Sequence, residues 1–176
     1  MALTFLRAGA IIIDLYRYLL WREWDPDGRR VLFIMLNPST ADGMMDDPTI
    51  RRCIGFAQAL GFGSLSVTNL FGYRSTSPQA LLSVADPIGT ENDAHIVQAS
   101  AQSATIIAAW GCHGRYLDRD RVVAELLNAQ GYTLFCFGHN QDGSPKHPLY
   151  VRKDTQLQPF IETSLLQEGS KAESFS

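Results

Sequence analysis

The chain has 176 residues, a hydrophobic fraction of 45%, a charged fraction of 19% and a formal net charge of −3. These values are typical of one globular domain with a buried core, and they lack the basic excess that nucleic-acid-binding proteins usually carry. No apolar run is long enough to span a bilayer, so we expect no membrane partner.

The expected compartment is the cytoplasm. Three cysteines, at positions 53, 112 and 136, are widely spaced and show neither a CxxC pair nor the pattern of a disulfide framework. The first residues lack the basic and apolar segments of a secretory signal. Both observations favour a reducing environment.

Strand patterns and helix patterns alternate along the chain. Strands are expected at residues 16–24, 31–36, 65–70, 105–110 and 133–138. Helices are expected at residues 47–60, 78–83, 92–102, 118–130 and 155–166. The first of these helices has Asp47 at its cap and Pro48 at its first position, which are the residue types that those positions favour. The strand expected at residues 31–36 is a continuous apolar run, as in sheets that are buried on both faces.

Alternating strands and helices predict right-handed βαβ units. We therefore expect an α/β fold with a single three-layer α/β/α domain over residues 1–166. Its central sheet is expected to be mainly parallel and four-stranded, with an additional N-terminal antiparallel strand or hairpin. The polar stretch 167–176 is predicted to be a disordered tail.

Ligands of such sheets bind beyond the carboxyl ends of the strands, where this sequence places three sets of polar residues. They are Asn37-Pro38-Ser39, Asn69 followed by Arg74, and His147-Pro148. An asparagine amide can orient a water or read a base edge, and a histidine between two prolines can donate to a developing anion. The alternative for each also stays open: Asn37 as a turn residue, Arg74 as a surface cation and His147 as a structural histidine.

Metal and cofactor binding find less support in the sequence. Carboxylates at Asp42, Asp46 and Asp47 could bind Mg²⁺, but Asp47 fits a helix cap better. The four histidines and three cysteines show no spacing that is typical of a zinc site, and no phosphate-binding loop or dinucleotide fingerprint is present. We expect neither a metal nor a cofactor.

Five short motifs lie at or near the ends of the expected strands. They are FIMLNPSTAD at 33–42, DDPTIRR at 46–52, NLFGYR at 69–74, Trp110-Gly111 and HPLY at 147–150. Together they resemble the family known as domain of unknown function 1643 (DUF1643), and the resemblance covers about residues 15–160. That family implies no established activity.

The order of the motifs is also similar to that of the uracil-DNA glycosylase superfamily. Met35-Leu36-Asn37-Pro38 occupies the place of a Gly-x-Asn-Pro or Gly-x-Asp-Pro motif, with methionine instead of glycine. Val67-Thr68-Asn69 resembles a following strand that ends in asparagine, and Lys146-His147-Pro148 resembles the final His-Pro motif. Arg74 and Trp110-Gly111 also have counterparts between these two motifs.

This second resemblance implies a uracil-DNA glycosylase-like fold and cleavage of an N-glycosidic bond. In that reaction the catalytic residues would be Asn37, whose carbonyl holds the attacking water, and His147, which stabilises the negative charge on the departing base. Asn69 would pair with the edge of a flipped base. The residues expected to bind substrate are Pro38, Ser39, Asn69, Arg74, Trp110, Pro148 and Tyr150.

The leading hypothesis is a glycosylase-like hydrolase that acts on a nucleobase, nucleotide or modified base. One alternative is a non-catalytic module that binds nucleotides or nucleic acid with the same pocket. The second alternative is a Mg²⁺-dependent, phosphate-directed hydrolase. The expected partner is a nucleobase, a nucleotide, or single-stranded or locally opened nucleic acid, and the sequence determines neither the base nor the oligomeric state.

Overall fold

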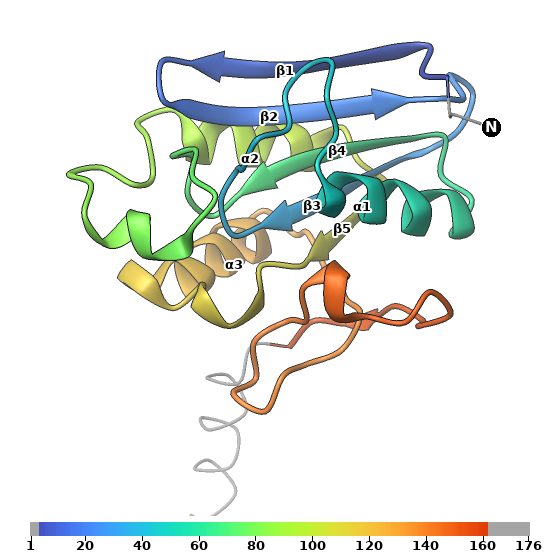
Figure 1. Ribbon diagram of the computed structural model, residues 1–176. Helices are drawn as coiled ribbons and strands as arrows, with labels where there is room; N and C mark the ends of the chain where they lie inside the picture. Colours follow the sequence, from blue (N-terminus) through green and yellow to red (C-terminus); the bar gives the residue numbers. More distant parts are fainter. Residues whose placement is uncertain (1–3, 162–176) are drawn as a thin grey trace, which may run out of the picture.

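A mixed β-sheet forms the centre of the computed structural model, which describes residues 4–161 (Figure 1). Within those residues the sheet has seven strands in the order β1-β2-β4-β3-β5-β6-β7. The strands are β1 (Arg7–Ile13), β2 (Tyr16–Glu23), β3 (Arg30–Met35), β4 (Ser64–Asn69), β5 (Thr105–Ala108), β6 (Leu134–Cys136) and β7 (Gln158–Pro159).

The prediction of a mainly parallel, four-stranded sheet is wrong, although the α/β class holds. Strands β4, β3, β5 and β6 run parallel, but β2 pairs antiparallel with β4, β1 with β2, and β7 with β6. The N-terminal hairpin is therefore one side of the sheet itself. The physical reason lies at the sheet edges, because β4 and β6 would otherwise present unpaired backbone groups to solvent.

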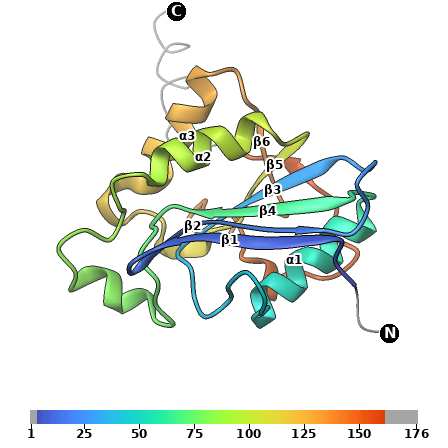
Figure 2. The same cartoon turned by 90° about the horizontal axis from the view of Figure 1, so that it is seen from above.

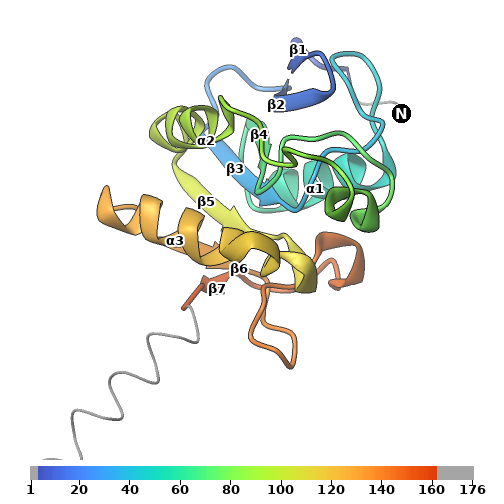
Figure 3. The ribbon, with the colours of Figure 1, turned by 90° about the vertical axis from the view of Figure 1, so that its left-hand side faces the viewer.

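Helices cover both faces of the sheet (Figures 2 and 3). Helix α1 (Pro48–Ala59) lies on one face, and α2 (Asn92–Ala101) and α3 (Arg119–Ala129) lie on the other. Strand β3 serves both layers, because its alternate side chains point to opposite faces. Phe33 packs in the core beneath α1, whereas Ile34 packs in the core beneath α2 and α3.

The local signals for α1 are confirmed. Asp47 is its N-cap and accepts a hydrogen bond at Oδ1 from the Ile50 backbone N–H at 2.8 Å, and Pro48 occupies the first turn. The apolar positions of the helix, among them Ile54 and Ala57, are buried against the sheet. The cap and the proline together explain why the helix begins at Pro48, directly after the loop that follows β3.

The prediction of a helix at residues 155–166 is wrong for residues 155–161, the part of this range that the structure describes. Residues 158–159 form β7, and the Phe160 N–H donates to the Leu134 carbonyl at 2.8 Å. Pro159 lacks an N–H, which a sheet edge tolerates. The predicted tail at 167–176 and the domain boundary at 166 lie outside the described residues. Over the described part of the chain, no helix has the length and apolar character needed to cross a membrane.

Two short 3₁₀ helices complete the part of the fold that concerns the site. The expected helix at 78–83 is the 3₁₀ helix η1 (Pro78–Leu82), and η4 (Pro148–Tyr150) follows directly after His147. Helix η4 lies close to α1. The segment after β6 thereby returns to the same side of the sheet as the loop after β3.

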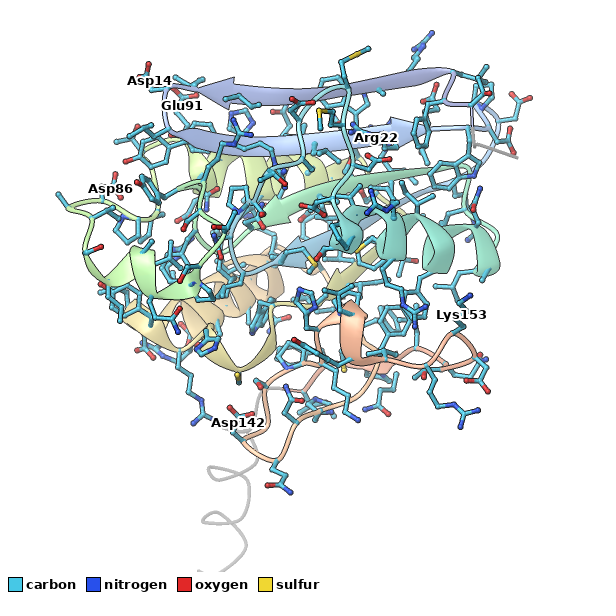
Figure 4. All side chains as sticks on the ribbon, viewed as in Figure 1. Asp14, Arg22, Asp86, Glu91, Asp142 and Lys153 are labelled. Atoms are coloured by element: carbon cyan, nitrogen blue, oxygen red, sulfur yellow. The ribbon has the colours of Figure 1, made fainter. Side chains whose placement is uncertain are left out.

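The loop between β3 and α1 is held against β2 by the buried side chain of Arg22 (Figure 4). Its Nε donates to Asp46 Oδ1 at 2.9 Å, and its Nη2 donates to the Asp42 carbonyl at 2.6 Å. Nη2 also forms a salt bridge with Asp46 at 2.8 Å. One side chain thus ties the N-terminal hairpin to the loop that carries Asn37 and Asp47.

Replacing Arg22→Met should lower the free energy of unfolding by about 3 kcal/mol, because it leaves a partly buried carboxylate and several carbonyl groups without donors. Urea denaturation measures the change. The control is Arg7→Met, because Arg7 has an 80% exposed side chain whose salt bridge to Glu23 spans 3.7 Å. That change should cost less than about 1 kcal/mol. Equal losses in the two variants would contradict the anchoring role of Arg22.

Candidate functional site

A cleft of about 510 Å³ lies at the carboxyl edge of the parallel strands. The register of the sheet places it there, because Met35 of β3 pairs with Asn69 of β4, and Ile34 of β3 pairs with Ala108 of β5. The three strands therefore end at nearly the same level. The segments that follow β3 and β5, together with η4, supply the walls.

Six of the nine predicted site residues line this cleft. They are Asn37, Ser39, Asn69, Trp110, His147 and Tyr150. The other three are close by but outside the lining. Pro38 accepts a hydrogen bond at its carbonyl from the Ser75 N–H at 2.8 Å, Pro148 is buried with its carbonyl facing Arg52 Nε at 3.3 Å, and Arg74 Nε donates to the Ser39 carbonyl at 3.4 Å. These contacts are structural.

The Asn37 side chain is oriented by two backbone carbonyls. Its Nδ2 donates to the Ser75 carbonyl at 2.9 Å and to the Pro38 carbonyl at 3.2 Å. Both amide hydrogens are thereby used, and Oδ1 is the acceptor that no donor within residues 4–161 occupies. Asn37 thus joins the end of β3 to the segment before η1 and keeps a carbonyl oxygen for a ligand or a water.

Asn69 is the most unusual polar group of the cleft. Its side chain is 1% exposed, and among the described residues neither Nδ2 nor Oδ1 has a hydrogen-bond partner. Leaving such a group unsatisfied costs about 1–3 kcal/mol. Its backbone carbonyl, in contrast, accepts from Asn92 Nδ2 at 2.9 Å. A buried amide with free donors and a free acceptor is suited to pairing with a ligand.

His147 is held as one tautomer. Its Nδ1 accepts from the Leu149 N–H at 3.2 Å, so in the neutral ring the proton resides on Nε2. Burial lowers the pKa of His147 below its ordinary value of 6.5, and the charge of Asp47 opposes this only in part. The ring is therefore neutral at pH 7 and offers an Nε2–H donor.

Asp47 lines the cleft in addition to capping α1. Its carboxylate acts through space on both His147 and Arg17. The sequence predicted that Asp47 caps the helix. Local spacing could not predict that the same side chain also lines the cleft. The other two carboxylates are engaged elsewhere, since Asp46 pairs with Arg22 and Asp42 accepts from the Met44 and Met45 N–H groups. Across residues 4–161, no three His, Cys, Asp or Glu side chains come together in a way that could hold a metal ion.

Arg17 lines the cleft, and sequence reasoning did not find it. A β-bulge explains its position. Leu19 pairs with Ile11 and Arg17 pairs with Ile12, so Tyr18 is the extra residue of β2. A bulge changes the alternation of side chains. Tyr18 consequently stacks on His95 of α2, whereas Arg17 donates from Nη1 to the Ala41 carbonyl at 2.7 Å, on the α1 side of the sheet.

Two aromatic residues contribute in different ways. Trp110 is 1% exposed and packs edge-on against Phe160, with ring centroids 5.3 Å apart, so it forms a fixed wall. Tyr150 is 84% exposed at the rim, with its ring centroid 5.8 Å from that of His147. Gly111 directly follows Trp110 and adopts a φ of +75°. A Cβ at this position would lie 3.6 Å from the Cβ of His147.

A comparison with protein families matches residues 17–149 to the family described as "Protein of unknown function (DUF1643)". The matched region begins at Arg17 and contains Asn37, Asp47, Asn69 and His147. Neither the curated proteins nor the solved structures contain a match.

The neutral state of His147 can be tested by NMR. We expect the Nε2–H tautomer and a pKa below 6.5, with His147→Gln used to assign the signals. Because the folded-state pKa is depressed, the stability that this residue contributes is present above pH 6.5 and is lost as the pH falls through the folded pKa. A pKa above 6.5, or a proton on Nδ1, would show that the ring is not held as described.

Stability measurements can separate Asn69 from the neighbouring asparagine. Asn69→Leu should leave the free energy of unfolding unchanged or raise it, because the amide makes no hydrogen bond with the described residues. The matched control is Asn92→Leu, which removes bonds from Nδ2 to the Asn69 and Leu70 carbonyls at 2.9 and 3.0 Å. That variant should lose about 1–3 kcal/mol. If Asn69→Leu is the more damaging change, the Asn69 amide serves the fold and not a ligand.

Proposed function

The chain belongs to the DUF1643 family, whose match covers every lining residue of the cleft except Tyr150, and we propose that this cleft binds a nucleobase and hydrolyses its N-glycosidic bond. The chemistry is that of the uracil-DNA glycosylase superfamily. The proposal rests on the side chains of the cleft and on no likeness of fold.

The observation that carries the proposal is the buried Asn69 amide without partners. A nucleobase edge presents an N–H donor beside a carbonyl acceptor, and a carboxamide presents the complementary pair in one plane. Binding a base would satisfy both amide atoms and recover the cost of leaving them buried. A volume of about 510 Å³ lies within the usual range for small-molecule sites.

His147 accounts for stabilisation of the leaving group. In N-glycosidic hydrolysis the bond between C1′ and the base nitrogen breaks, and its electron pair leaves with the base. The neutral ring can donate its Nε2–H to a base oxygen as negative charge develops there. A neutral donor retains its proton through this step, so it acts as a hydrogen-bond donor and not as a general acid.

Asn37 and Asp47 account for the other half of the reaction. The free Oδ1 of Asn37 can hold a water against C1′. The carboxylate of Asp47 can stabilise the positive charge that grows on the sugar and can take the proton that the water loses. The hydroxyl of the water then resides on C1′, and a proton from solvent completes the departed base.

The proposed compartment of this activity is the cytoplasm, where a reducing environment would keep the free cysteines Cys53, Cys112 and Cys136 as thiols. Tyr150, exposed at the rim, offers a face on which a base or sugar can stack.

The test combines a ligand screen with product analysis. Nucleobases, nucleosides, nucleotides and single-stranded oligonucleotides are screened by their effect on the unfolding midpoint, and binders are assayed for free base by chromatography. His147→Gln should lower kcat by about a hundredfold or more, with little change in binding, because its donor acts mainly in the transition state. Asn69→Leu should weaken binding first.

Asn37→Ala should lower kcat with nearly unchanged ligand affinity. Its unfolding midpoint is recorded alongside, because the variant also loses the hydrogen bond to Ser75. A wild-type protein that binds a nucleotide but never releases free base would favour the non-catalytic binding module. If Asn37→Ala unfolds, Asn37 is a structural turn residue.

A further inference from the structure

Arg17 is a buried cation that the structure leaves incompletely paired. Its side chain is 2% exposed, and burial lowers its pKa to about 10, so it stays protonated at neutral pH. A guanidinium carries five N–H donors. Nη1 donates to the Ala41 carbonyl, whereas Nε finds no acceptor among residues 4–161.

Arg22, five positions along the same strand, is equally buried but fully engaged. It has a salt bridge to Asp46 and hydrogen bonds to several backbone carbonyls. Arg17 makes no salt bridge with any carboxylate of the described chain, and Asp47 and Asp42 act on it only through space. Burying a charge without a partner costs free energy of folding. An apolar residue at position 17 would therefore be expected if the position served stability alone.

The cleft supplies the access that such a cation needs. Arg17 belongs to its lining, as do the hydroxyl-bearing residues Ser39, Thr49, Ser75 and Thr76. A second positive charge, on Arg74, is close enough to lower the pKa of Arg17 further. Guanidinium groups and hydroxyls are the donors that proteins commonly use to bind phosphate oxygens.

We propose that Arg17 is the phosphate receptor of the cleft and that the substrate is a nucleoside monophosphate and not a nucleic-acid polymer. This inference rests on the proposed function for the base. It adds the phosphate, which is bound through the free donors of Arg17 while Asn69 holds the base.

The depth of Arg17 favours a terminal phosphate. A phosphate monoester has three free oxygens and a single link to the sugar, so it can enter a recess end-on. A diester within a polymer continues on both sides, and both continuations would have to leave the recess. With a net charge of −3, the chain also lacks the excess of basic residues with which proteins usually bind a nucleic-acid backbone.

The experiment measures binding of matched ligands to the full chain. Four nucleosides, their 5′-monophosphates, inorganic phosphate and an unphosphorylated single-stranded oligonucleotide are titrated by calorimetry and thermal unfolding. We expect at least one monophosphate to bind about tenfold or more tightly than its nucleoside. Arg17→Met should abolish that difference, and Arg7→Met, at a residue outside the lining, should preserve it.

Stability provides a second readout. Arg17→Met should unfold at the wild-type midpoint or above it, because removal of an unpaired buried charge outweighs the loss of its one hydrogen bond, to the Ala41 carbonyl. A drop as large as that of Arg22→Met would give Arg17 a structural role and overturn the inference. If Arg17→Met does not fold, Arg17→Lys replaces it. Lysine keeps the positive charge but lacks the planar guanidinium, whose paired N–H groups can bind two phosphate oxygens. The variant should therefore bind the monophosphate more weakly than the wild type.

The outcomes separate this inference from the proposed function. Equal binding of nucleoside and monophosphate would overturn the phosphate site and leave the nucleobase site intact. Binding of inorganic phosphate that Arg17→Met removes, with no binding of any nucleobase ligand, would overturn the proposed function and leave Arg17 as an anion receptor. An oligonucleotide that binds as tightly as the monophosphate, and loses affinity in Arg17→Met, would overturn the choice of a monomeric substrate.

Discussion

The attachment of the β3–α1 loop to β2 is the interaction on which the cleft depends. Buried Arg22 of β2 holds this loop through the Asp42 and Met45 carbonyls and the Asp46 carboxylate, and Arg17 adds a single hydrogen bond to the Ala41 carbonyl. A loop has few backbone partners of its own, and buried carbonyls need donors. The hairpin that completes one side of the sheet therefore also determines where Asn37 and Asp47 lie.

The same two arginines differ in how completely the fold pairs them. Arg22 is neutralised by Asp46 and serves the fold, whereas Arg17 keeps free donors toward the cleft. Asn69 and Asn92 differ in a similar way, because Nδ2 of Asn92 ties the end of β4 to α2 and leaves only Oδ1 unpaired, whereas among the described residues neither amide atom of Asn69 has a partner. In each pair one member carries an energetic cost that a bound ligand would offset.

Local hydrogen bonds select which atom of each polar side chain is left free toward the cleft. The Ser75 and Pro38 carbonyls take the amide hydrogens of Asn37 and leave its carbonyl oxygen, and the Leu149 N–H takes Nδ1 of His147 and leaves Nε2–H. Acceptor and donor are therefore preorganised, so neither has to reorient when a ligand arrives. The neutral imidazole follows from burial, which disfavours the charged ring.

The sequence by itself determined most helices and strands before residue 155, the cap of α1 and the positions of Asn37 and Asn69 at the ends of β3 and β4, because each depends on local periodicity or turn chemistry. The pairing of the parallel strands and the return of the segment after β6 then brought Asn37, Asn69 and His147 to one cleft. The tertiary structure alone decided the edges of the sheet, since pairing of β2 with β4 and of β7 with β6 joins segments far apart in the chain. It also decided the role of Arg17. In a strand with strict alternation, position 17 lies on the opposite face from Leu20 and Arg22, and only the bulge at Tyr18, a property of the pairing with β1, brings Arg17 to their face.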